Sequence, residues 1–260
     1  MQDIDSYNKT TILGNMTPGT AYYIRDNRDE ETYCVSKLND GNLWMIDNLR
    51  LDITIPTIMS GLTTTNTNVD TNSLTSLKSG NRSAGTQYAS AGFEIWDSSH
   101  TSDVYNRAKA NADYKNTINT NTSKNYGNGS HKYGVYYNYC AATAGSYCYD
   151  SGTGASNASF DLCPANWRMP SGGDNGEYQS LYATYSSNAA NFRNALSTPL
   201  SGAFGSGHTY DQREVGYFWS STSYSNKTYV YRLSVQSNSV KPSIIDNRKN
   251  GISLRCLLES

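Results

Sequence analysis

The sequence predicts an α+β protein whose strands and helices are segregated along the chain. Apolar runs bounded by turn residues predict strands within residues 20–50, capping residues predict helices between about 177 and 196, and alternating apolar residues predict strands in the final third. Strands, then helices, then antiparallel strands are typical of the α+β class. At 260 residues the chain could hold one large domain or two small ones; we expect a single domain over 1–260 with one long insertion.

The first predicted element is a β-hairpin. Residues 31–38 (ETYCVSKL) are typical of a strand, residues 39–42 (NDGN) of a tight turn, and residues 43–46 (LWMI) of the returning strand. We therefore expect the two runs to pair as antiparallel strands.

A long polar insertion is expected at about 57–130. This stretch is poor in apolar residues and rich in Thr, Asn and Ser, and the segments 63–68 and 116–122 approach low complexity. An apolar patch at 93–96 and a helix-capable segment at 102–114 lie between those segments. We interpret the stretch as an insertion over the core, with a functional lid as the alternative.

Two helices are predicted after a compact segment that contains two prolines. Residues 133–139 (YGVYYNY) favour a strand, and residues 162–170 (LCPANWRMP) favour an extended or turned conformation. Residues 171–177 then supply caps for a helix from Glu177 to about Tyr185, and a second helix is expected over Ala189–Leu196.

The final third is predicted to be rich in strands. The candidates are residues 218–221 (FWSS), 229–235 (YVYRLSV) and 252–258 (ISLRCLL). In a strand over 229–235, odd-numbered and even-numbered side chains lie on opposite faces. Leu233 and Val235 favour the odd-numbered face as the one that packs inward at its far end.

Composition excludes some classes of partner. Charged residues make up 17% of the chain, against about 25% in ordinary soluble domains, and the formal net charge is -1. We therefore expect neither nucleic acid nor an anionic membrane surface as partner. No apolar run approaches the roughly 20 residues of a membrane span, so this segment is not expected to insert into a bilayer. Because residues 2–6 are polar, no signal peptide follows Met1; we expect a trimmed extracellular or cell-surface chain rather than a cytosolic one.

Cysteine usage fits an oxidising compartment. The residues Cys34, Cys140, Cys148, Cys163 and Cys256 form no CxxC motif and no Cys/His cluster, so structural zinc is not expected. Cys140 and Cys148 flank a short loop that a disulfide would close. The odd count leaves one thiol unpaired or an unseen partner, and buried reduced thiols in a cytosolic protein remain the alternative.

Four short motifs occur in an order that resembles a known family. They are Trp44-Met45 with Asn48-Leu49, Cys163-Pro164 with Trp167-Arg168-Met169-Pro170, Phe218-Trp219-Ser220-Ser221, and Arg255-Cys256. In order and spacing, the chain from about residue 30 to its end, apart from the insertion, resembles the Fibrobacter succinogenes major paralogous domain. This resemblance implies a C-type-lectin-like fold in which the first and last strands lie side by side.

The same resemblance implies a disulfide pairing. Cys163 and Cys256 would correspond to the long disulfide that ties the first helix to the last strand in lectin-like folds. Leu43 departs from relatives that carry Cys before the Trp-Met pair, so the role of Cys34 is open.

Domains of this family also occur as variable proteins of diversity-generating retroelements, bacterial elements that mutagenise adenines in a template copy. A randomised AAC or AAT codon reaches Tyr, Ser, Asp, Thr, Ile or Asn, but not Lys, Gln, Glu, Met or Trp. Residues 223–247 are close to this alphabet, although Lys227, Gln236 and Lys241 fall outside it. The resemblance therefore implies a variable ligand-binding set: Ser223, Tyr224, Ser225, Asn226, Tyr229, Tyr231, Ser237, Asn238, Ser243, Ile244, Ile245, Asp246 and Asn247.

We expect this surface to bind a partner. Tyr gives large, rigid contact area at low entropic cost, and Ser and Asn give adaptable hydrogen bonds. Tyr224 and Tyr229 are the expected anchors of the interface, beside a loop at 243–247. The expected function is adhesion or ligand binding outside the cell, with an unidentified protein or glycan as the ligand. A solvated sheet face in a purely structural surface module is one alternative.

An enzyme is the other alternative, because the formylglycine-generating enzymes share the lectin-like fold. Their paired-cysteine copper site needs two reactive thiols close together, whereas the best-placed cysteines here are expected to be structural, and no nucleophile–base set, GxSxG, HExxH or phosphate-binding glycine loop occurs. We therefore expect no catalysis, no cofactor and no metal. Asp174 and Asp246 leave calcium as an alternative, and the scattered His100, His131 and His208 are not expected to be ligands.

Overall fold

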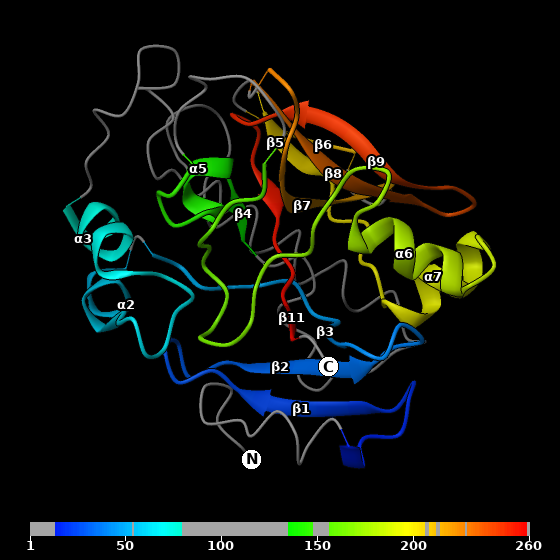
Figure 1. The fold of residues 1–260 in the computed structure, drawn as a ribbon, viewed down its shortest axis with the longest axis horizontal. Helices are drawn as coiled ribbons and strands as arrows, with labels where there is room; N and C mark the ends of the chain where they lie inside the picture. The colour runs from blue at the N-terminus through cyan, green and yellow to red at the C-terminus, as the bar shows by residue number, and fades with distance from the viewer. Residues whose placement is uncertain are drawn as a thin grey trace.

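The computed structural model describes residues 14–53, 55–79, 135–147, 156–205, 208–211, 214–226 and 228–258. Its strands form a four-stranded, a five-stranded and a two-stranded sheet, with short helices packed around them (Figure 1). This combination of largely antiparallel sheets and a few helices confirms the predicted α+β class.

The four-stranded sheet contains the predicted hairpin and the end of the chain. Its order is β1 (Ala21–Arg25), β2 (Thr32–Lys37), β3 (Leu43–Met45) and β11 (Leu257–Leu258). The Asp40 carboxylate fixes the turn between β2 and β3, because it accepts hydrogen bonds from the Asn42 amide at 3.1 Å and from Trp44 Nε1 at 2.9 Å. Gly41 has φ 86°, a left-handed conformation that suits glycine.

The five-stranded sheet contains most of the C-terminal third. Its order is β4 (Tyr136–Tyr137), β10 (Ile252–Ser253), β7 (Val215–Ser223), β8 (Tyr229–Gln236) and β9 (Val240–Asn247). The predicted strands at 218–221 and 229–235 are confirmed as parts of β7 and β8. Residues 243–247 were expected to form a loop, and this expectation is wrong: they belong to β9, which pairs with β8 along its length. The two-stranded sheet consists of β5 (Ala203–Gly205) and β6 (His208–Tyr210).

Two other strand predictions need correction. The run 252–258 is two strands in different sheets, because β10 pairs with β4 and β7 whereas β11 pairs with β3. The last strand therefore lies beside β3, and β2 and β3 separate it from β1. Within 133–139, the described residues form only the short β4, because Asn138 caps a helix that begins at Tyr139: its side chain accepts a hydrogen bond from the Ala141 amide.

The two predicted helices are confirmed. They are α6 (Glu177–Thr184) and α7 (Ala189–Ala195). Ser171 and Glu177, the first residue of α6, hydrogen-bond each other: Glu177 Oε2 accepts from the Ser171 amide at 2.7 Å, and Ser171 Oγ accepts from the Glu177 amide at 3.1 Å. The predicted number of helices, two, was too small, because α2 (Pro56–Gly61), α3 (Thr71–Ser79) and α5 (Tyr139–Ala142) are also present.

The start of the predicted insertion packs into the domain. Helices α2 and α3 lie in this stretch, and Leu62, Val69 and Leu77 are buried in the core. Residues 80–130 lie outside the described residues. The single-domain organisation over 1–260 stays a prediction.

Buried side chains form two clusters on opposite faces of the five-stranded sheet. Trp219 belongs to one cluster and its neighbour Phe218 to the other, as expected for adjacent residues of a strand. The second cluster lies under α6 and α7, where Leu181 and Phe192 are fully buried. Trp44, Trp167 and Trp219 are at most 1% exposed, which confirms the expectation that they are core residues.

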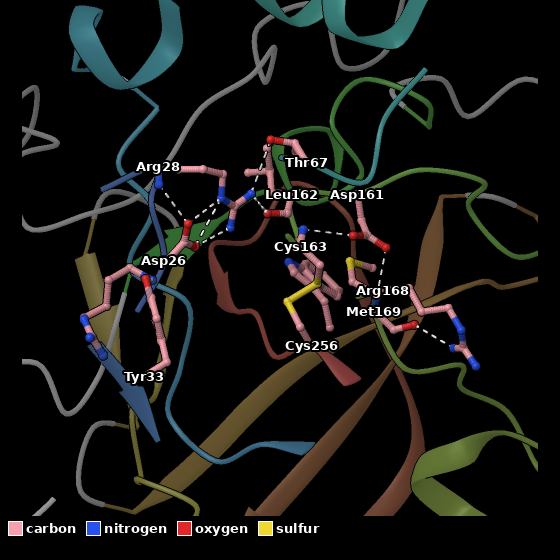
Figure 2. The surroundings of a disulfide bond; sticks show 12 residues. Asp26, Arg28, Tyr33, Thr67, Asp161, Leu162, Cys163, Arg168, Met169 and Cys256 are labelled. Atoms are coloured by element: carbon pink, nitrogen blue, oxygen red, sulfur yellow. Dashed lines mark hydrogen bonds and ion pairs between the residues drawn. A yellow bond between two sulfur atoms is a disulfide. The ribbon is translucent and has the colours of Figure 1, made fainter. Parts of the chain in front are cut away.

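The disulfide between Cys163 and Cys256 is present (Figure 2), with a Cα–Cα distance of 5.7 Å. It does not join a helix to the last strand: Cys163 lies in an irregular segment, and Cys256 directly precedes β11. Cys140 is also disulfide-bonded, and Cys148 lies outside the described residues. Cys34 is a free thiol buried in the core.

A buried carboxylate holds the segment that carries Cys163. The Asp161 side chain is 2% exposed and accepts hydrogen bonds from the amides of Cys163 at 2.9 Å and Met169 at 2.8 Å (Figure 2). Burial raises the pKa of Asp161 from 3.8 to about 6, even though these hydrogen bonds favour the ionised form.

This raised pKa predicts a pH dependence of stability. Because the folded protein binds the Asp161 proton more tightly than the unfolded chain does, ionisation costs stability as the pH rises from about 4 through 6. Lowering the pH from 7 to 5 should therefore raise the free energy of unfolding through this group by about 1 kcal/mol. Urea unfolding across this range measures the effect. Asp161→Asn, which cannot titrate, should reduce the slope, and an unchanged slope in the variant would contradict the assignment.

Candidate ligand-binding site

The candidate site is built on β7, β8 and β9. Strand β8 pairs antiparallel with β7 on one side and with β9 on the other. Leu233 and Val235 are fully buried, which confirms the inward face expected at the far end of β8. Val230, on the even-numbered face, is also fully buried, so the strand is anchored in both cores.

Side chains at the near end of β8 and β9 form an exposed, tyrosine-bearing surface. Tyr229 lies opposite Asn247, and Tyr231 lies opposite Ile245, so these four side chains share one face of the strand pair. Tyr229 is 37% exposed and Ile245 is 38% exposed. Tyr224 joins them because its ring meets that of Tyr231 edge-on, with a centroid distance of 5.5 Å. We call Tyr224, Tyr229, Tyr231, Ser243, Ile245 and Asn247 the tyrosine face.

A glycine pair before α6 lets the backbone approach the tyrosine face. A Cβ atom on Gly172 would lie 2.6 Å from Tyr231 Cβ, and Gly173, with φ 86°, faces the ring of Tyr231. The next residue, Asp174, accepts a hydrogen bond from Ser243 Oγ at 3.2 Å. The 172–174 loop therefore borders the tyrosine face. Sequence reasoning missed this role, for which the Gly-Gly pair was the available signal.

Several residues of the predicted binding set do not lie on the tyrosine face. Ser223 is fully buried, with its hydroxyl 3.1 Å from Tyr147 Oη and donating to the carbonyl of Ser156 at 3.2 Å, so the prediction that it contacts ligand is wrong. Ser237 and Asn238 are exposed in the β8–β9 turn, at the opposite end of an eight-residue strand and therefore roughly 25 Å away. Ser225 and Asn226 are exposed beside Tyr224.

Ile244 and Asp246 lie on the other face of β9. Asp246 Oδ2 is 2.6 Å from Arg232 Nε, and Asp246 Oδ1 accepts from Asn250 Nδ2 at 2.7 Å. The Arg232 guanidinium also lies 4.0 Å from the centre of the Tyr217 ring. Asp246 therefore has a structural role, because it compensates a largely buried cation, and its expected place in the ligand patch is wrong.

This ion pair predicts the effect of removing Asp246. Asp246→Ala should lower the free energy of unfolding by about 1–3 kcal/mol, because Arg232 would remain largely buried without its counter-charge. Chemical denaturation measures the loss. Asp174→Ala is the matched control, since that exposed carboxylate should change stability by no more than about 0.5 kcal/mol. Equal losses in the two variants would contradict the structural role of Asp246.

The structure also shows where the candidate calcium ligands and the free thiol lie. Asp174 and Asp246 lie on opposite faces of the β8–β9 pair and do not form the calcium site considered as an alternative. Among the described residues, no group of three or more His, Cys, Asp or Glu side chains is arranged to hold a metal ion. Burial raises the pKa of the Cys34 thiol to about 12, whereas a reactive cysteine needs a lowered pKa.

Comparison with known proteins returned no match among family models, curated proteins or solved structures. Within the described ranges, no helix has the length and apolar character needed to cross a bilayer. Function is therefore inferred from the geometry of the tyrosine face.

Proposed function

We propose that this chain is a ligand-binding protein with a C-type-lectin-like fold, whose tyrosine face is a contact surface diversified by a retroelement. The observation that carries the proposal is the exposure of Tyr229 on β8, a strand that is otherwise anchored in two cores, and of Ile245 beside it on β9. Aromatic side chains that bring contact area without much loss of entropy are the usual anchors of binding interfaces. The surface is thus preorganised, which lowers the entropic cost of binding.

Three features support the lectin-like fold. The terminal strand β11 lies in one sheet with the N-terminal hairpin, a disulfide links residues 93 positions apart, and α6 and α7 pack on the five-stranded sheet. The disulfide also supports a secreted or cell-surface location, since such bonds persist in oxidising compartments.

The distribution of burial supports diversification. Ser225, Asn226 and Tyr229 are exposed, so substitution there should cost little stability. Core residues such as Val230 and Leu233 lie between the variable positions and are fully buried. A face of this kind can change its contacts while the scaffold stays the same.

The proposal predicts a second copy of the coding DNA. A nearby near-identical repeat of the segment encoding the C-terminal third should differ from it at adenines of the repeat, and the differences should fall in codons of exposed residues such as Ser225, Asn226, Tyr229 and Ile245. Sequencing this region in independent isolates tests the proposal. The codons of Phe218 and Leu233, both fully buried, are the internal control and should be constant. Absence of a repeat, or differences spread evenly over buried and exposed codons, would contradict it.

A further inference from the structure

A polar cleft lies beside the tyrosine face. Its volume is about 610 Å³, within the range of roughly 300–1,000 Å³ that is usual for small-molecule sites. One wall comes from residues 157–161 and the other from 166–171, with Ser221 of β7 between them. Strand β7 holds both walls in place: the Ala158 amide donates to the Ser221 carbonyl at 2.7 Å, and the Ser221 amide donates to the Pro170 carbonyl at 2.8 Å.

A buried indole N–H in the lining has no hydrogen-bond partner, and a serine hydroxyl in the same lining makes no hydrogen bond to the described residues. Trp167 is 1% exposed, and its Nε1 makes no hydrogen bond. Ser221 is 6% exposed, and in the part of the chain that the structure describes no side chain or carbonyl bonds to its hydroxyl. Because buried polar groups are nearly always paired, unpaired groups in the lining of a cleft point to a ligand or water that completes them.

The charged residues of the cleft are already paired. Arg168 donates to both carboxylate oxygens of Glu177, at 2.7 Å and 2.5 Å. The carboxylate of Asp161 is occupied by two backbone amides. The cleft therefore offers no free cation to a phosphate or carboxylate, and no open carboxylate to a cationic ligand.

The remaining lining is neutral and polar. Asn157, Ser159 and Asn166 are exposed at the rim, and their amides and hydroxyl can both donate and accept hydrogen bonds. The side chain of Met169 is fully buried, so it offers no wall to an apolar ligand or to peptide side chains. Sugar hydroxyl groups, which also donate and accept, match such a lining.

We propose that this cleft binds a neutral, hydroxyl-rich ligand, namely a short oligosaccharide. The site is distinct from the tyrosine face and does not depend on its proposed diversification. Thr222 joins the two regions, because its hydroxyl accepts from the Gly172 amide at 2.9 Å and donates to Asn157 Oδ1 at 2.5 Å. A saccharide bound in the cleft would lie next to whatever the tyrosine face contacts, and would be recognised by side chains outside residues 223–247.

Calorimetric titration of the full chain with neutral trisaccharides of glucose, galactose or mannose tests the proposal, with inorganic phosphate and triglycine as comparison probes. At least one trisaccharide should bind saturably, and neither comparison probe should. Ser221→Ala removes a hydroxyl that has no protein partner, so the fold should be retained while saccharide affinity falls about fivefold, the effect of one hydrogen bond. Ser180→Ala, the same change on an exposed residue of α6 outside the cleft, should leave affinity unchanged.

Other outcomes of the titration would contradict the proposal. Failure of every trisaccharide to bind at millimolar concentration would overturn the proposal, as would equal affinities of the two serine variants. Stronger binding of phosphate or triglycine would show that the cleft serves another ligand. Should Ser221→Ala lose its fold, Ser159→Ala at the exposed rim replaces it and is expected to weaken saccharide binding in the same direction.

Discussion

The path of the terminal segment 251–258 through the core is the constraint on which the rest of the structure depends. Every one of these residues is buried, and the segment leaves the five-stranded sheet after β10 and enters the four-stranded sheet as β11. The disulfide between Cys163 and Cys256 ties the stretch between β10 and β11 to the segment that carries Asp161. The guanidinium of Arg255, which is fully buried, donates to Asn48 Oδ1 at 2.9 Å and to the carbonyl of Leu196. One short stretch therefore ties both sheets and the end of α7 together.

This arrangement explains how an exposed tyrosine surface can sit on a stable scaffold. Because β10 pairs with β7, the terminal segment supports the sheet from which β8 and β9 extend. Burial of Val230 on one face and Leu233 on the other leaves β8 little freedom to shift its register, since a one-residue slip would exchange inward and outward side chains. The exposed side chains of such a surface can be substituted without reorganisation of the backbone.

Local patterns in the sequence were sufficient for part of the fold. The β2–β3 hairpin, α6, α7 and the burial of the tryptophans follow from turn chemistry, capping and apolar spacing, which act over a few residues. Contacts between residues far apart in the sequence could not be predicted. Asp246 on β9 forms an ion pair with Arg232 on β8, and the buried Ser223 is hydrogen-bonded to Ser156. The split of residues 252–258 between two sheets was hidden for the same reason, because an apolar run carries no signal of which sheet each half joins. In the candidate site, period-two alternation predicted the strand β8 on which the site is built, but not the contribution of Gly172.

Hydrogen exchange of the variant lacking both Cys163 and Cys256 tests the central claim most directly. If the terminal segment ties the sheets together, loss of the disulfide should lower the free energy of opening by about 2–5 kcal/mol for amides in both sheets, for example Met45 in β3 and Phe218 in β7. Met45 is informative because its amide donates to the Cys256 carbonyl. Faster exchange confined to the irregular segment around Cys163, with both sheets protected as before, would contradict the account.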